Sequence, residues 1–198
     1  MKAGSKRCKP SRRAVARGRW RWDPLWREQA GTQLLEFALL LPLLAVLAVG
    51  TIDFASGYVL KQKLTNAARE GARIATEQSP ADLTQPIPNT IQATRNAVVN
   101  YLDNADLDVS GIGATPTKTG VREWTYYNGG DALIVIDRAV TYPVTSGGVT
   151  ILTVATRVTV RYPFSWSFAQ IIQLLVPSAS YNSSFLISTD VVMKNLVP

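Results

Sequence analysis

Residues 31–52 read GTQLLEFALLLPLLAVLAVGTI, an apolar run that follows a glycine and contains a single carboxylate, Glu36. The 19 residues from Leu34 to Ile52 form a helix of roughly 28 Å at about 1.5 Å per residue, close to the ~30 Å hydrocarbon core of a bilayer. The run therefore predicts a transmembrane helix over 32–53. Pro42 removes one backbone hydrogen bond inside it, so we expect a local kink or loosening there.

Basic residues are concentrated ahead of this helix. Residues 1–31 hold ten of the 21 Lys and Arg but only two of the 14 Asp and Glu, a net charge of +8, whereas residues 32–198 carry −1. The net charge of +7 therefore describes the leader, and it gives no reason to expect a nucleic-acid partner. Because positive flanks stay cytoplasmic, we expect the C-terminal domain to be extracytoplasmic. Three tryptophans alternate with arginines in this leader: Trp20, Trp22 and Trp26. This pattern suits a segment that lies at the interface of an anionic leaflet. The alternative is a basic tail that only sets the topology.

A secretory signal peptide is the alternative interpretation of a basic segment followed by an apolar one. The apolar run is longer than a usual signal-peptide core, and no Ala-x-Ala cleavage site follows it. The sequence Gly50-Thr51-Ile52-Asp53-Phe54 continues instead in a helical pattern. The pattern favours a retained membrane helix.

The helical pattern continues beyond the span, over residues 54–78, as an amphipathic segment. One stripe repeats at spacings of three and four residues, which places its members on one helix face: Leu60, Leu64, Ala67, Gly71 and Ala75. Small residues in its second half permit close backbone approach, either by the chain's own domain or by a neighbouring subunit. Ser79-Pro80 ends the helix, because the residue before a proline disfavours the helical region.

Three separated blocks in order carry a resemblance to a known family. They read EFALLLP over 36–42, IDF over 52–54 and LTNAAREGAR over 64–73. Together, over roughly residues 27–77, they resemble the TadE-like family, the pseudopilins of the tight-adherence (Tad) pilus and secretion machinery. The long leader, rich in Arg and Trp, departs from that pattern.

The resemblance implies cleavage by a prepilin peptidase after Gly31, so that Thr32 becomes the first mature residue and Glu36 the fifth. An ionised carboxylate inside a membrane costs about 2.5–3.5 kcal/mol on insertion scales, and such groups usually have a partner. The α-ammonium of Thr32 on an adjacent subunit would be that partner. A charge pair in apolar surroundings fixes register more surely than it adds stability.

The remainder, residues 79–198, is expected to be an exported α+β domain. A proline-containing linker leads to an amphipathic helix over 90–102, with Thr94 the one polar residue on its inner face. Four runs then predict an antiparallel meander with turns at Asn128-Gly129-Gly130 and Ser146-Gly147-Gly148: 121–127, 132–144, 149–162 and 184–193. Pro143 indicates an edge strand or a strand end.

Alternation within the third of these runs predicts which side chains face the core. Five residues are assigned to the buried face: Leu152, Val154, Val158, Val160 and Tyr162. Thr156 is the polar exception on that side. The apolar residues 163–176 are too few for a second span and are interpreted as an excursion that is buried or faces a partner.

Residue types needed for catalysis are scarce. The chain has no histidine, and its one cysteine, Cys8, lies in the leader, which removes the commonest general base and the usual zinc ligands. Asp103, Asp106 and Asp108 form an acidic cluster, but the spacing is not that of an EF-hand loop. We therefore expect no enzyme, no cofactor and no metal site.

The combined prediction is a pilin-like α+β fold, with a long N-terminal helix packed on a small antiparallel β-meander. Four regions are expected, namely the basic cytoplasmic leader 1–31, the membrane helix 32–53, its amphipathic continuation 54–78 and the exported domain 79–198. The expected function is that of a minor pilin-like subunit of the inner membrane. Its expected partners are the membrane, a prepilin peptidase, other pilin-like subunits and the assembly platform. The alternative is an uncleaved, membrane-anchored binding module.

Overall fold

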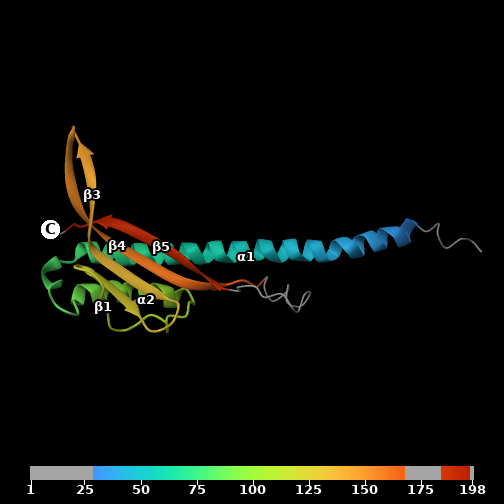
Figure 1. Ribbon diagram of the computed structural model, residues 1–198, viewed down its shortest axis with the longest axis horizontal. Helices are drawn as coiled ribbons and strands as arrows, with labels where there is room; N and C mark the ends of the chain where they lie inside the picture. The colour runs from blue at the N-terminus through green and yellow to red at the C-terminus, as the bar shows by residue number, and fades with distance from the viewer. Residues whose placement is uncertain (1–28, 168–183, 197–198) are drawn as a thin grey trace, which may run out of the picture. The chain divides into compact units, whose positions relative to one another are not determined.

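The computed structural model describes residues 29–167 and 184–196. Helix α1 runs over Gln29–Glu77 and continues through Pro42; the boundary between the chain's two compact units, Met1–Pro42 and Leu43–Pro198, lies within it. A short 3-10 helix, Pro80–Asp82, and helix α2, Asn89–Asn104, follow. Strands β1 to β5 then form one sheet (Figure 1).

The sheet is an antiparallel meander in which each strand pairs with its neighbour in sequence, in the order β1-β2-β3-β4-β5. Its bounds are β1 Thr117–Lys118, β2 Glu123–Tyr127, β3 Leu133–Ser146, β4 Val149–Ser165 and β5 Ser184–Lys194. This arrangement confirms the predicted α+β class with a helix packed on a meander. The two-residue strand β1 had no counterpart in the sequence analysis.

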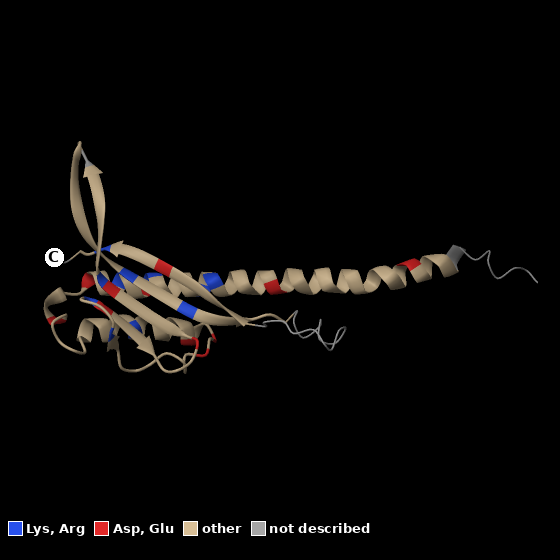
Figure 2. Cartoon of the chain, viewed as in Figure 1, with Lys and Arg blue, Asp and Glu red and all other residues tan. Residues whose placement is uncertain are grey.

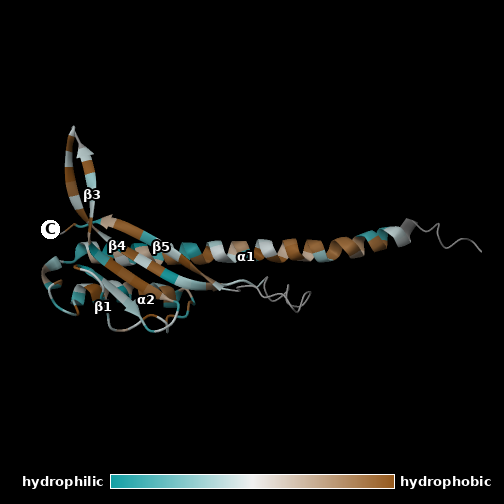
Figure 3. Ribbon diagram, in the orientation of Figure 1, coloured by the Kyte–Doolittle hydropathy of each residue, from teal (hydrophilic) through white to brown (hydrophobic). Residues whose placement is uncertain are grey.

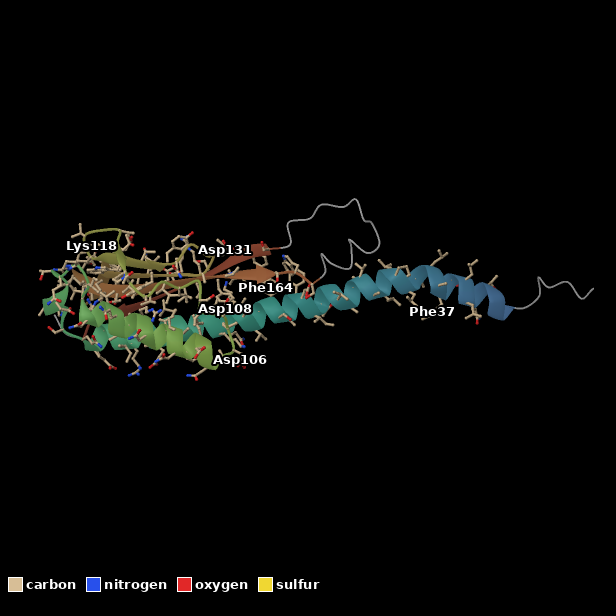
Figure 4. The ribbon with its side chains drawn as sticks, turned by 90° about the horizontal axis from the view of Figure 1, so that it is seen from below. Phe37, Asp106, Asp108, Lys118, Asp131 and Phe164 are labelled. Atoms are coloured by element: carbon tan, nitrogen blue, oxygen red, sulfur yellow. The ribbon has the colours of Figure 1, made fainter. Side chains whose placement is uncertain are left out.

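The core lies between one face of the sheet and two helices, α2 and the C-terminal part of α1 (Figures 1 and 4). Leu64 of α1 and Val98 and Leu102 of α2 are fully buried against β2, β3 and β4. The opposite sheet face carries polar residues such as Arg157 and Arg161, both exposed. One wet and one covered face is the usual arrangement for an antiparallel sheet, and it explains the alternation in the strands.

Helix α2 begins at Asn89 because a carboxylate caps it from outside. Asp82 accepts hydrogen bonds from the backbone N–H and the hydroxyl of Thr90, each at 2.8 Å. Thr94, the polar residue expected on the inner face, is fully buried, and its hydroxyl donates to the carbonyl of Thr90 at 2.8 Å. A buried hydroxyl satisfied in this way costs the core little.

The prediction that Leu152 and Val154 face the core is wrong. They are 74% and 42% exposed, whereas Thr153 and Ala155 are buried. At this point β3 carries one extra residue, because its register against β4 shifts between Asp137 and Val140. Such a bulge bends and twists the strands, and beyond it the buried side chains of β4 are Ala155 and Thr153. Val158 and Val160, on the other side of the bulge, are fully buried as predicted.

Beyond the bulge, the two central strands continue as a ribbon of their own, the arm, defined as residues 139–156 (Figure 1). Gly147 and Gly148, with φ of +57° and +81°, turn the chain at its tip, as the sequence predicted and as a two-residue hairpin turn requires. Pro143 lies in the arm, where β2 no longer pairs with β3. It pairs with Leu152 of β4 on one side, so β3 has one edge without a described strand partner here, as expected of an edge position.

Strand β4 extends three residues past the predicted end and pairs Pro163 with Leu186 of β5. The rest of the predicted excursion, from Phe168 on, and the leader with its three tryptophans lie outside the described residues.

Candidate functional site

The residues expected to be processed or to set register lie in the first turns of α1. Gly31, Thr32 and Glu36 are all exposed, and among the described residues no atom outside the adjoining helix backbone lies within 4 Å of a Cβ added at Gly31. Glu36 makes no salt bridge within the described ranges. The structure thus presents a carboxylate on an apolar helix surface without a charge partner from those ranges.

Beyond its first turns, the N-terminal part of α1 is mostly hydrophobic (Figure 3). Among the described residues, α1 is the one helix long and apolar enough to cross a membrane, with a mean hydropathy of 2.3 over a window that is 0% buried. Leu34, Phe37 and Leu39 are 70%, 55% and 72% exposed; Figure 4 shows Phe37 pointing outward. Large apolar side chains left uncovered in this number mark a surface that meets lipid or other proteins.

In contrast to these exposed residues, the stripe in the C-terminal part of α1 is covered. All five stripe positions are buried: Leu60, Leu64, Ala67, Gly71 and Ala75. A Cβ added at Gly71 would overlap a methyl group of Val98 on α2 and would touch Val158 of β4 at 3.6 Å. Of the two partners that the sequence left open, the chain's own domain occupies this face.

An aromatic cluster lies where the apolar part of α1 ends. Phe54 of α1 meets Trp166 edge-to-face at 5.4 Å between ring centroids, and Trp166 stacks on Phe185 of β5 at 5.2 Å. Phe164 contacts both Trp166 and Phe185 and lies over Gly57, where an added Cβ would be 3.6 Å from its ring. The C-terminal end of β4 and the start of β5 are thereby fixed to the helix, just beyond its apolar run.

The arm combines exposed apolar side chains with an absence of charge. Residues 139–156 contain no Lys, Arg, Asp or Glu, and Figure 2 shows the arm without a charged residue. Val149, Ile151 and Leu152 are 64%, 57% and 74% exposed. In the part of the chain that the structure describes, β2 pairs with β3 no further than Asp137, and β5 pairs with β4 no further than Ala155, at the base of the arm. The outer edges of the rest of the arm, residues 140–154, have no strand partner in that part of the chain.

A buried arginine holds the base of the arm. Arg138 is 1% exposed and donates to the carbonyl of Gln78, just past the end of α1, at 3.1 Å. Burial lowers the pKa of this guanidinium, and the nearby Asp82 carboxylate opposes that effect. A cation near a helix C-terminus is favourable because the helix dipole is negative there. The sequence analysis missed this residue, although Arg138 has the same strand parity as the core residues Ile134 and Ile136.

The acidic cluster lies at the C-terminal end of α2, which contains Asp103, and in the exposed loop that follows (Figures 2 and 4). Asp103, Asp106 and Asp108 are exposed, and Asp108 accepts hydrogen bonds from the N–H and hydroxyl of Ser110 at 2.9 and 3.0 Å. Within the described ranges, no three Asp, Glu, His or Cys residues are grouped so that they could hold a metal ion.

A comparison with protein families finds that the model described as TadE-like protein matches residues 31–73. This match confirms the resemblance inferred from the three sequence blocks, and it covers Gly31, Glu36 and most of the stripe. Neither the curated proteins nor the solved structures yielded a match to the chain. The match and the apolar helix together support a Tad-pilus-associated protein with a single-pass membrane anchor.

Proposed function

We propose that this protein, whose residues 31–73 match the TadE-like family, is a minor pilin-like subunit of a tight-adherence pilus or secretion apparatus. Its role is structural and not enzymatic. The observation that carries the proposal is the position of the match, because one continuous segment contains the glycine at the proposed cut, the carboxylate five residues later and the apolar helix. A membrane-anchored binding module would need neither Gly31 nor Glu36.

The proposed location is the cytoplasmic membrane, with the leader inside and the sheet domain outside. Ten basic residues precede the apolar helix, and basic flanks are retained on the cytoplasmic side. The proposed partners are a prepilin peptidase, other pilin-like subunits and the inner-membrane assembly platform. Protease added to spheroplasts should digest the sheet domain and spare the leader of unprocessed chains.

Processing is tested by the N-terminal residue of the protein extracted from its own membrane. Cleavage after Gly31 leaves Thr32 as the first residue, whereas an uncleaved anchor retains Met1. Gly31→Trp should accumulate a slower-migrating precursor that still carries the leader. Recovery of this variant at wild-type size would place the cut elsewhere.

The proposed role of Glu36 is to accept the α-ammonium of Thr32 from an adjacent subunit. Glu36→Gln removes the charge and keeps the shape, so we expect normal insertion and cleavage but loss of co-purification with other pilin-like subunits. The matched control is Glu77→Gln, an exposed carboxylate in the last turn of the same helix. Normal assembly of Glu36→Gln would contradict the register role.

The arm supports the proposal because it has the features of a contact surface for another protein. Exposed strand edges in natural proteins usually carry charges that prevent pairing, and residues 139–156 carry none. Leu152→Lys should therefore block incorporation into the apparatus while the domain stays folded. Val121→Lys, at a position that is 87% exposed outside the arm, is the control and should assemble normally.

A further inference from the structure

The aromatic cluster at Phe54, Phe164, Trp166 and Phe185 has a geometry that the pilin role does not by itself require. It lies two residues beyond Ile52, where the apolar run ends. Part of it is uncovered, because Phe54 is 72% and Phe185 is 41% exposed. Two further side chains on the same surface, Tyr58 and Leu186, are 65% and 51% exposed.

The position of this surface relative to the bilayer follows from the distance of its residues from Ile52 along α1. Phe54 lies roughly 3 Å and Tyr58 roughly 9 Å past Ile52 along the axis, at about 1.5 Å per residue. The headgroup zone on each side of a bilayer is about 5–7 Å thick. A helix that spans with Leu34–Ile52 in the hydrocarbon therefore places Phe54 within the headgroups and the backbone of Tyr58 about 2–4 Å beyond them. Helical side chains tilt toward the N-terminus, so the ring of Tyr58 can reach back to the headgroups.

The sheet domain is held at the same height by direct ring contacts. Trp166 and Phe185 belong to the β4–β5 end of the sheet, and Trp166 meets Phe54 at 5.4 Å. Phe164 packs on Gly57, where no side chain separates strand from helix. The strand ends therefore lie close to the level of Phe54 along the helix.

The chemistry of the surface matches that level. Aromatic rings are enriched at membrane–water interfaces, where an apolar body meets lipid and a polar edge meets water. Lys61 lies on the same groove as Tyr58 and Phe185, and its long side chain can reach toward phosphate headgroups. The acidic group closest in sequence, Asp53, is 2% exposed and presents little charged surface to a bilayer.

We infer that the cluster of Phe54, Tyr58, Phe164, Trp166 and Phe185 is a lipid-interface site, through which the sheet domain rests on the outer surface of the membrane. The inference rests on the proposed membrane anchor and adds that the domain itself contacts lipid. Before assembly, this contact holds the domain in one orientation. The occupant is the phospholipid headgroup layer.

The test places a fluorescent label at single cysteines in the full chain, with Cys8 replaced by serine. The chain is reconstituted in vesicles of equimolar phosphatidylethanolamine and phosphatidylglycerol, with a quencher either on the lipid near the headgroup, deep in the acyl chains or dissolved in water. Labels at Phe185→Cys and Tyr58→Cys report the proposed site. A label at Leu44→Cys reports the anchor, and one at Leu152→Cys on the arm is the water-exposed control.

The inference expects the headgroup-level lipid quencher to reduce emission at 185 and 58 and the aqueous quencher to have little effect there. The deep quencher should act at 44 and the aqueous quencher at 152. Quenching at 44 together with water exposure at 185 and 58 overturns the lipid contact and leaves the anchor intact. Shielding of 185 and 58 from both quenchers also overturns it, because a protein then covers the cluster. Absence of lipid quenching at 44 instead contradicts the membrane anchor of the proposed function.

Discussion

Helix α1 contains two halves that treat apolar side chains in opposite ways. In the first, Leu34 to Ile52, large residues such as Leu39 and Leu47 are 72% and 59% exposed. In the second, Leu64, Ala67 and Ala72 are completely buried by the sheet and α2. A single helix thus has two environments: the exposed apolar surface of the first half suits lipid, and the second half packs on its own domain. From Ala67 onward the second half also differs in residue size, because large side chains cover surface in lipid and small ones allow close packing.

The comparison is tested most strongly by the same leucine truncation in each half. Leu64→Ala empties a fully buried site and should lower the free energy of unfolding of the sheet domain by about 2–5 kcal/mol. Leu44→Ala, at a position that is 53% exposed, should leave domain unfolding unchanged. Urea denaturation in detergent micelles, followed by near-ultraviolet circular dichroism, measures both. Equal effects would mean that the halves are not distinct.

An introduced charge should have a large effect in the first half of α1 and a small one in the second. Leu44→Arg places a guanidinium near the middle of the apolar run and should disfavour membrane insertion by about 2.5–3.5 kcal/mol. Gln62→Arg, on an exposed position of the second half, should insert as well as the wild type. Glycosylation-tag mapping of inserted and non-inserted chains gives the ratio. Efficient insertion of the Leu44 variant would argue against lipid as the partner of the first half.

Two glycines sharpen the comparison at a smaller scale. Gly71→Ala gains helix propensity of about 1 kcal/mol but collides with Val98, and overpacking typically costs about 1–3 kcal/mol. We expect a net loss of up to about 2 kcal/mol, seen as a lower melting temperature. Gly50→Ala should not lower it, because no described atom outside the adjoining helix backbone lies within 4 Å of the added Cβ. A stabilised Gly71 variant would show that α2 can move away.

The smallest effect is expected from the surface charges of the second half. Hydrogen bonding to Arg73, at 2.6 Å, lowers the pKa of Glu70 from its ordinary value of 4.5. A lowered carboxyl pKa contributes stability that is present above the unfolded-state value and is lost as the pH falls through the folded-state value. The melting temperature of the wild type should thus fall slightly more than that of Glu70→Gln below about pH 4.5. The difference should shrink in high salt, because both side chains are exposed and are screened.

The sheet shows where prediction from sequence stopped. Alternation correctly placed Val158 and Val160 in the core, because those residues keep regular pairing with β3. The same alternation failed at Leu152 and Val154, since the bulge lies on the partner strand and the period of β4 itself contains no trace of it. Arg138 was missed for a related reason. A charged residue at a core position is acceptable because groups distant in sequence stabilise it, namely the Gln78 carbonyl at the end of α1 and the Asp82 carboxylate.

The amino-acid sequence by itself determined the apolar helix, the spacing of Gly31, Thr32 and Glu36, the small-residue stripe and the meander of strands. These are properties of neighbouring residues along the chain, and helix and strand periods report them directly. Tertiary structure decided which partner the stripe meets, which apolar residues of β3 and β4 form the exposed arm, and how Trp166 and Phe185 come to lie beside Phe54. Those outcomes depend on strand register and on contacts between residues distant in the sequence, such as Gly71 with Val98 and Phe54 with Trp166, which no local pattern encodes.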